Sequence, residues 1–398
     1  MGYIYKAGVV GAGTMGSGIA QLLTYANFPV VLKEENEEAL EKGVSRIRKT
    51  YQKRVEKGKM TPQELDLKMA LIQPTITYDA FHDVDLVIEA VPERADLKRD
   101  VFAKLDHVCP PSSILTSNTS SLSIHDLAQA TGRPGKVAGL HFFHPVRVMK
   151  LVEVIPAEST APDTVDTCIG LVETLRKIPI RVSDGTGFLV NRLLMPYISE
   201  AAIALQEGAA PAPEIEQALT EFGMPMGPFF LADNLGLDIC RDVAQTFEAA
   251  YGERAKAPKI FNLLCEKERF GMKAGAGFYS YGDAPDILSE LVVDKKESGF
   301  STDRIVLRMI NEAIHCLEER VASATDIDMA MVAGAGFPID RGGLLHHADR
   351  EGLDTILEGL KKLESELGVR FRPSSLLQRK VQAGHTGVQA KRGFFDYT

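Results

Sequence analysis

The sequence predicts an open α/β sheet domain followed by two related all-α domains. In the first half, short aliphatic and β-branched runs alternate with amphipathic helical segments, as in a doubly wound sheet. After Thr186 such runs vanish and long helical patterns replace them. Landmarks of the second half also occur twice in the same order. These observations predict domains over residues 1–184, 185–294 and 299–398.

The composition is that of an ordinary globular protein. The chain has 398 residues, of which 45% are hydrophobic and 25% charged, and a formal net charge of −9 that argues against a nucleic-acid partner. Its five cysteines are scattered without metal-type spacing, so we expect reduced core cysteines and no metal site. Because no apolar signal or membrane-spanning run precedes the first predicted strand, we expect a cytoplasmic protein without membrane insertion.

A glycine-spaced turn near the start organises the first domain. The predicted strand Ala7 to Val10 runs directly into Gly11-Ala12-Gly13-Thr14-Met15-Gly16. In such a turn the first glycine permits the bend, the second lets a diphosphate approach the backbone, and the third lets the next helix pack tightly. The start of that helix then points its amides at the phosphates. The pattern predicts a Rossmann-type dinucleotide site, with a glycine turn in an unrelated α/β protein as the alternative. The residues predicted to form this site are Gly11, Gly13, Thr14, Met15 and Gly16.

An acidic residue ends the second predicted strand, which covers 29–33. Glu34 lies 23 residues after Gly11. In dinucleotide-binding folds an acid near this position accepts hydrogen bonds from the adenosine ribose hydroxyls. Glu34 and Glu35 would repel a 2′-phosphate, and no arginine follows at once. We therefore expect the cofactor to be NAD rather than NADP.

A helical hairpin with a basic first arm is predicted between this strand and the next. Apolar residues recur at helical spacing over 40–55, and 61–64 has the capping box of a return helix. One acid, Glu56, interrupts a run of cations. The residues alone leave open whether a polyanion binds this arm or whether it is a solvated face. The cations are Arg46, Arg48, Lys49, Lys53, Arg54, Lys57 and Lys59.

A dense polar loop, Ser117 to Ser121, follows the predicted strand over 114–116. In open α/β sheets, ligands bind at the carboxyl ends of the strands, although a hydroxyl-rich turn without a ligand is the alternative. Ser123 is positioned to cap the next helix. The remaining predicted strands cover 85–91, 137–143, 151–155 and 178–182.

Two polar residues, His141 and Glu153, interrupt apolar strands. A buried carboxylate is costly unless it is paired, and an imidazole is its natural partner. Together they would make a candidate base with an orienter, whereas a core histidine bonded to a backbone carbonyl is the alternative. Asn191 interrupts the apolar helix predicted over 188–205 in the same way, with a helix–helix hydrogen bond as its alternative.

The second half contains an internal duplication. Gly187-Phe188 recurs 112 residues later as Gly299-Phe300, and Gly277-Phe278 recurs 116 residues later as Gly393-Phe394. We expect two tandem helical domains with a linker over 295–298. Asp303 stands where the first copy has Asn191, which fits a structural role for the second copy.

These residues resemble the 3-hydroxyacyl-CoA dehydrogenases of fatty-acid β-oxidation over essentially the whole chain. The resemblance implies NAD-dependent oxidation of (S)-3-hydroxyacyl-CoA to 3-oxoacyl-CoA. It makes His141 the general acid/base on the 3-hydroxyl and Glu153 its orienter. The duplicated C-terminal part further resembles the dehydrogenase part of the multifunctional β-oxidation α-subunit. The runs that carry the resemblance are Gly11 to Gly16, Ser117 to Ser121, His141 to Phe143, Lys150 to Val154, Gly187 to Arg192 and Met226 to Pro228.

The resemblance also implies roles for further residues. Ser120 and Asn191 would hold the substrate, and the basic arm would meet the CoA nucleotide through Thr50 and Lys57. At His144, close to the nicotinamide, the family usually has asparagine, and a histidine still offers a hydrogen-bond donor there. The positions implied to contact NAD, besides the glycine turn, are Glu34, Glu93, Lys98, Ser120, His144 and Lys273.

Two other functions stay open on the sequence alone. A dehydrogenase of a free hydroxy or sugar acid on the same fold would have no use for the basic arm. A crystallin-like, non-catalytic NAD-binding relative would not need His141 with Glu153. Because one helical domain forms the dimer interface in shorter members of the family, the resemblance also implies an internal pseudo-dimer of the two helical copies. A looser homodimer through another surface stays open.

Overall fold

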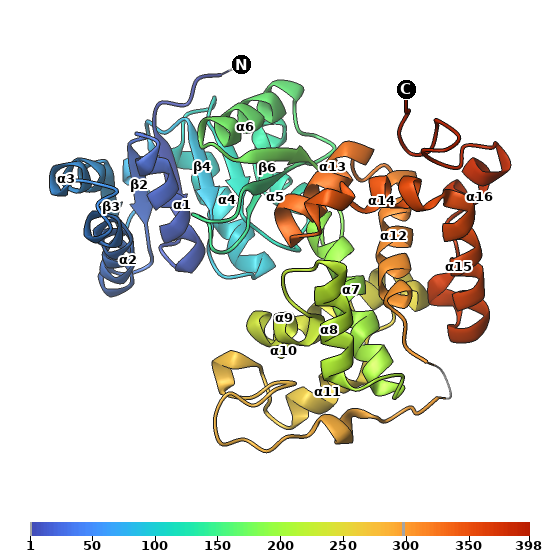
Figure 1. Ribbon diagram of the computed structural model, residues 1–398. Helices are drawn as coiled ribbons and strands as arrows, with labels where there is room; N and C mark the ends of the chain where they lie inside the picture. The colour runs from blue at the N-terminus through green and yellow to red at the C-terminus, as the bar shows by residue number, and fades with distance from the viewer. Residues whose placement is uncertain (1, 297–298) are drawn as a thin grey trace. The chain divides into compact units, whose positions relative to one another are not determined.

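The computed structural model describes residues 2–296 and 299–398 (Figure 1). The chain divides into two compact units, Met1–Phe188 and Leu189–Thr398. The predicted linker over 295–298 lies partly outside the described residues.

The described residues of the first unit build an eight-stranded sheet in the order β3-β2-β1-β4-β5-β6-β7-β8. Neighbouring strands are parallel except at β6 and β7, which pair antiparallel, so β7 and β8 run opposite to the others. Every strand predicted from the sequence is confirmed, with ends that differ by a few residues. The strands are β1 (Ala7–Val10), β2 (Val30–Lys33), β3 (Ile72–Thr75), β4 (Leu86–Glu89), β5 (Ile114–Ser117), β6 (Val137–Phe142), β7 (Leu151–Pro156) and β8 (Ile178–Arg181).

The edge strand β3 was not predicted. Its sequence is Ile72-Gln73-Pro74-Thr75, and only Ile72 is buried. Proline cannot donate to a ladder and is found in sheets chiefly at edges, so this segment gives little strand signal. Its pairing with β2 is nevertheless parallel and in register.

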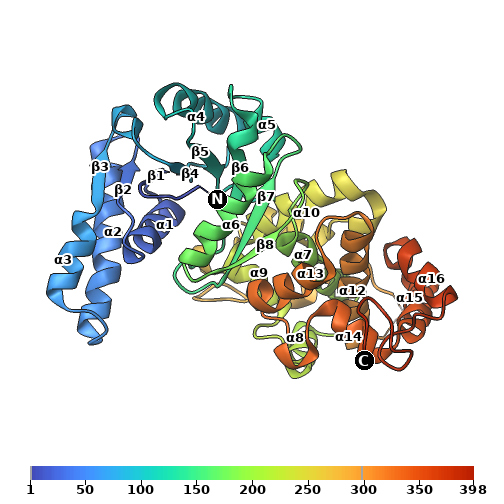
Figure 2. The ribbon, with the colours of Figure 1, turned by 90° about the horizontal axis from the view of Figure 1, so that it is seen from above.

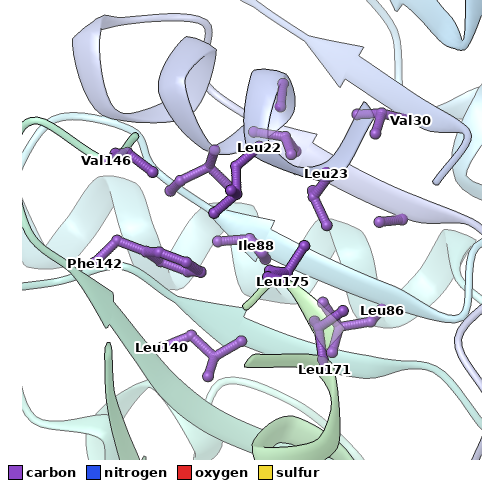
Figure 3. Packing of buried hydrophobic residues seen from close by; sticks show 14 of the residues in the cluster. Leu22, Leu23, Val30, Leu86, Ile88, Leu140, Phe142, Val146, Leu171 and Leu175 are labelled. Atoms are coloured by element: carbon purple, nitrogen blue, oxygen red, sulfur yellow. The ribbon is translucent and has the colours of Figure 1, made fainter. Parts of the chain in front are cut away.

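Helices α1 and α6 cover one face of the sheet and share its apolar core (Figure 3). The strands contribute alternate residues, such as Leu140 and Phe142 of β6 or Val152 and Val154 of β7. Since successive side chains of a strand point to opposite faces, the residues between them face the other side. The helices of this unit are α1 (Thr14–Tyr25), α2 (Glu37–Glu56), α3 (Pro62–Ala70), α4 (Ala95–Val108), α5 (Ile124–Ala128) and α6 (Pro162–Thr174).

Helices α2 and α3 follow β2 and lie side by side before the chain enters β3 (Figure 2). The side chain of Asn36 caps α2. The capping box between Thr61 and Glu64 starts α3, and Ser123 caps α5, so both predicted caps are confirmed.

The described part of the second unit is helical apart from isolated bridges. The helix predicted from Phe188 begins at Val190, because Phe188 has the left-handed φ of +49° and cannot continue into a helix. Helices α7 and α12 pack against each other. The helices are α7 (Val190–Gln206), α8 (Ala212–Phe222), α9 (Pro228–Leu235), α10 (Leu237–Tyr251), α11 (Lys259–Glu266), α12 (Thr302–Glu318), α13 (Ala324–Met329), α14 (Leu344–Glu351), α15 (Leu353–Leu367) and α16 (Ser375–Gln382).

In each half of this unit, a buried aspartate forms hydrogen bonds to a turn that lies far along the sequence. Asp233 accepts hydrogen bonds from the Phe278 and Tyr279 amides and the Tyr281 hydroxyl. Asp349, 116 residues later, makes the same three bonds to the turn over 394–397. The sequence analysis did not single out either aspartate, although both are buried.

Each of the five cysteines lies among the described residues and is buried and unpaired, which confirms the prediction of reduced core cysteines. In the portion of the chain that the structure describes, no helix combines the length and apolar character needed to cross a bilayer.

Candidate functional site

The glycine turn between β1 and α1 has the geometry of a diphosphate-binding loop. Gly11 has a φ of +99°, and a Cβ at Gly16 would lie 1.8 Å from the Gly11 carbonyl oxygen. At Gly13, by contrast, an added Cβ would have no described heavy atom within 4 Å. Thr14 is exposed and Met15 half-buried in the first turn of α1. The turn therefore leaves bare backbone and helix amides open to an anion, which fits a dinucleotide.

Side chains from α2 and from the residue after β2 hold this turn in place. The Glu34 Oε2 atom accepts a hydrogen bond from the Ala12 amide at 2.6 Å. On α2, Arg46 donates from Nη1 to the Ala12 carbonyl at 2.8 Å, and Gly43 leaves no room for a Cβ, which would lie 2.4 Å from that of Ala12. The carboxylate of Glu34 thus lies beside the glycine turn, where a ribose acceptor is expected. The residues present fit NAD.

His141 and Glu153 form the predicted pair. They lie directly opposite each other in the antiparallel ladder of β6 and β7, and Nδ1 of His141 is 2.6 Å from Oε2 of Glu153. His141 is 7% exposed and Glu153 is fully buried. The rings of Phe143 and Phe188 lie 4.5 Å and 5.9 Å from the imidazole. Since Nδ1 faces the carboxylate, Nε2 points away from it and is the nitrogen placed to exchange a proton.

A buried ion pair lies at the carboxyl ends of β4 and β5. Lys98 donates to Glu89 at 2.7 Å, and both side chains are fully buried or nearly so. Ser117 donates to the other oxygen of Glu89 at 2.6 Å. Sequence reasoning missed Glu89, although an acid in an apolar strand is the same signal that singled out Glu153. The Lys98 ammonium is engaged in this pair, and its contact with NAD stays a prediction.

Glu93 links this ion pair to the polar loop. Its Oε2 lies 3.2 Å from Lys98 Nζ, and its Oε1 accepts hydrogen bonds from the Thr119 hydroxyl and the Ser120 amide. Burial alone would raise the pKa of Glu93, but Lys98 and these hydrogen bonds hold that pKa below its usual value. Glu93 is therefore an anion at neutral pH that fixes the backbone of Ser120.

The polar loop is also tied to the strand that carries His141. Asn118 accepts a hydrogen bond from the Phe142 amide at 2.9 Å. The loop that holds Ser120 is therefore fixed one residue away from His141 along β6. This arrangement brings the predicted substrate-binding serine and the predicted base to the same end of the sheet.

A cavity of about 490 Å³ opens between α1, α2 and the segment 144–147. Thr50 and Lys57, the predicted CoA contacts, both line it, as does His144. Within the described residues no carboxylate lines this cavity. The cavity gives the basic arm a concave surface suited to a polyanion, which a solvated face would lack. Its cations are Arg46, Lys49, Lys53, Arg54, Lys57, Lys59 and Arg147.

The basic surface continues into a second cavity of about 540 Å³ that shares Arg54, Lys59 and Arg147 with the first. Lys177 lines it, and its ammonium donates to two backbone carbonyls. Burial and the neighbouring Lys150 lower the pKa of Lys177 to about 8. Cations thus line both cavities. Together the two cavities form an extended basic surface that suits a ligand with several phosphate groups.

Asn191 and Lys273 belong to the second unit. Asn191 is half-buried in the first turn of α7, and Lys273 forms an exposed ion pair with Asp238 at 2.6 Å. Their proposed contacts with substrate and cofactor stay predictions.

Fold and site together define an oxidoreductase with a Rossmann-type dinucleotide-binding domain. The sequence matches the NAD-binding domain of 3-hydroxyacyl-CoA dehydrogenase over residues 6–185 and the C-terminal domain of that family over residues 187–281 and 299–397. The chain belongs to the 3-hydroxyacyl-CoA dehydrogenase family.

Individual relatives agree with this assignment. The fatty acid oxidation complex subunit alpha of Shewanella oneidensis is 39% identical over 388 residues, which cover 94% of this chain and 55% of that protein. The chain therefore spans about half the length of this relative. The sequence of 3-hydroxybutyryl-CoA dehydrogenase from Escherichia coli is 30% identical to that of this chain. Its crystal structure aligns with a TM-score of 0.87, covering 96% of this chain and 99% of that one. An (S)-3-hydroxybutyryl-CoA dehydrogenase from Ralstonia eutropha is 35% identical, with a TM-score of 0.69 over 71% of this chain and all of that one.

The two glycines of the turn should respond differently to an added methyl group. We expect Gly13→Ala to leave the free energy of unfolding unchanged and to weaken NAD binding by about tenfold or more, because the methyl group occupies the diphosphate position. Gly16→Ala should instead lower the free energy of unfolding by about 1–3 kcal/mol through its clash with Gly11. Chemical denaturation and calorimetric NAD titration measure both effects. Unchanged NAD affinity in Gly13→Ala would place the diphosphate elsewhere.

Proposed function

We propose that the chain oxidises (S)-3-hydroxyacyl-CoA to 3-oxoacyl-CoA with NAD, in fatty-acid β-oxidation or 3-hydroxybutyryl-CoA metabolism. The observation that carries this proposal is the cation-lined cavity beside the glycine turn. Thr14 of the turn lines it, and Arg46 both lines it and bonds to Ala12. A free hydroxy or sugar acid has no phosphate groups that would bind these cations, whereas coenzyme A has several.

NAD, when bound, supplies the hydride acceptor. His141 removes the proton of the 3-hydroxyl through Nε2 while the C3–H bond breaks, so that the carbonyl forms. Glu153 holds the imidazole through Nδ1 and stabilises the imidazolium that results. Ser120, fixed through Glu93, and Asn191 orient the substrate oxygen. In the reverse direction His141 returns the proton to that oxygen.

Removing the base should affect turnover rather than binding. We expect His141→Ala to lower kcat by about two to four decades with nearly unchanged NAD affinity, the usual worth of a positioned general base. Glu153→Gln keeps a hydrogen-bonding group but loses the charge, and should lower kcat by about one to two decades with little change in KM. NADH absorbance with (S)-3-hydroxybutyryl-CoA as substrate measures both. Near-normal turnover of His141→Ala would refute the assignment of this base, and an inactive unaltered protein would favour a non-catalytic relative.

The basic arm should act on the CoA substrate alone. We expect replacement of Lys49, Lys53 and Lys57 by glutamate to raise KM for the CoA thioester at least tenfold, more at low salt, with little change in KM for NAD. The reason is that all three lysines line the 490 Å³ cavity.

The control for this variant carries the same change of charge elsewhere. Replacing the exposed Lys361, Lys362 and Lys391 by glutamate should leave both constants unchanged. The free acid (S)-3-hydroxybutyrate should be a poor substrate. Equal effects on both Michaelis constants, or good turnover of the free acid, would favour a dehydrogenase of free hydroxy acids.

We infer that the two helical copies form an internal pseudo-dimer. Support comes from reciprocal ion pairs between α7 and α12, in which an arginine of each helix contacts a glutamate of the other. Arg192 of the first copy lies 2.8 Å from Glu312 of the second, and Arg304, 112 residues later, lies 2.7 Å from Glu200 of the first. Such reciprocal contacts are the pattern of an isologous interface. The shorter relative from Ralstonia eutropha, which covers 71% of this chain, would need a second molecule to form it.

A protein that ends at Asp294 should therefore expose the α7 face. We expect it to self-associate or aggregate, because Arg192 and Glu200 lose their partners and apolar surface is uncovered. Sedimentation velocity of this protein and of the full chain measures the difference. A truncated protein that stays monomeric, soluble and fully active would contradict the pseudo-dimer.

A further inference from the structure

The interface between α7 and α12 holds a buried network of ion pairs with internal symmetry. Besides the two pairs described above, Arg254 lies 3.1 Å from Glu319, and Arg370, 116 residues after Arg254, lies 2.8 Å from Glu200. Each arginine of one half thus bonds to glutamates of the other. The symmetric set, called the arginine network below, balances four cations with four anions. Its members are Arg192, Arg254, Arg304, Arg370, Glu200, Glu207, Glu312 and Glu319.

Arg308 adds a buried cation that has no symmetric counterpart, and Lys296 is a further cation, 2.5 Å from Glu207. The residue 112 positions earlier is Pro196, which lies inside α7 and carries no charge. The Arg308 side chain is only 6% exposed. Its Nη2 donates to the Arg254 carbonyl, but among the described residues its Nη1 has no hydrogen-bond partner. The carboxylate paired with it is that of Glu312, whose Oε2 lies 3.6 Å from Nη1.

Glu312 neutralises Arg308 only in part, because two other cations share its charge. Its Oε1 accepts a hydrogen bond from Arg192 at 2.8 Å, and its Oε2 lies 3.7 Å from Arg254. Burial lowers the pKa of the Arg308 guanidinium, yet a guanidinium keeps its proton at neutral pH in proteins. A buried positive charge that is only partly neutralised is destabilising. The network therefore needs one further negative charge next to Nη1.

A small cavity lies where that charge is needed. It measures about 30 Å³, and Arg308 lines it together with Arg192, Arg254 and Arg370. The glutamates that line it, Glu200 and Glu312, are both bonded to arginines. A cavity of this volume has room for a water molecule or a monatomic anion.

We propose that this cavity is a binding site for a chloride ion or an anion of that size, held by Arg308 Nη1 and the arginines around it. The anion completes the charge balance of the arginine network and so stabilises the packing of α7 on α12. This role is independent of the reaction proposed above, because every residue that lines the cavity belongs to the second unit.

The first experiment compares thermal stability in sodium chloride and in sodium gluconate at equal ionic strength. We expect chloride to raise the Tm of the full chain saturably, by about 2–4 °C, because only the folded state binds it, and gluconate is a much larger anion with a diffuse hydroxylated surface. Arg308→Met should lose this response. The matched control is Arg379→Met, an exposed arginine whose removal should leave the response intact. A chloride response in Arg308→Met equal to that of the full chain would overturn the proposal.

The second experiment uses the unaltered protein, so it does not depend on the folding of a variant. Crystals grown in sodium bromide should show an anomalous peak in the cavity, within hydrogen-bonding distance of Arg308 Nη1. Density of an ordered water without anomalous signal at that place would overturn the proposal.

Discussion

The antiparallel pairing of β6 with β7 is the constraint on which the site depends. It sets His141 opposite Glu153 and turns both side chains away from the apolar cluster that α1 and α6 cover. A shift of one residue in this register would bury the two polar side chains among aliphatic ones and expose Leu140 to the site. Because the carboxylate is fully buried, its contact with the imidazole helps to offset the cost of burying its charge. The register of the two strands and the geometry of the His141–Glu153 pair therefore depend on each other.

Helix α2 couples the cofactor turn to the cation-lined cavity. Arg46 and the bare backbone of Gly43 hold the Ala12 peptide, while the next turns of the same helix place Lys49, Lys53 and Lys57 on the cavity wall. One rigid element thus supports two recognition surfaces at a fixed distance. This placement gives a physical reason for a long basic helix between β2 and β3, where a plain mononucleotide-binding unit has only a connection.

Local signals in the sequence predicted much of the first unit, and the features that were missed had weak local signals or depended on contacts between elements. The glycine turn, Glu34 and the capping box at Thr61 depend on neighbouring residues, so their spacing predicts them. The pairing of His141 with Glu153 was predicted because both interrupt apolar strands. The strand β3 escaped because Pro74 masks it, and the ion pair of Glu89 with Lys98 because it joins a strand to the following helix. The buried Nη1 of Arg308, which has no hydrogen-bond partner among the described residues, was not predicted, because it depends on side chains that only the folded structure brings together.

The central claim is that His141 exchanges the proton of the substrate's 3-oxygen while Glu153 holds its other nitrogen. A crystal structure of the complex with NAD and acetoacetyl-CoA tests it most directly. The account predicts that the 3-oxo oxygen lies within hydrogen-bonding distance of His141 Nε2, with Nδ1 still on Glu153 and the CoA phosphates against Lys49, Lys53 and Lys57. A 3-oxo oxygen bound by other residues, with His141 out of reach, would contradict it.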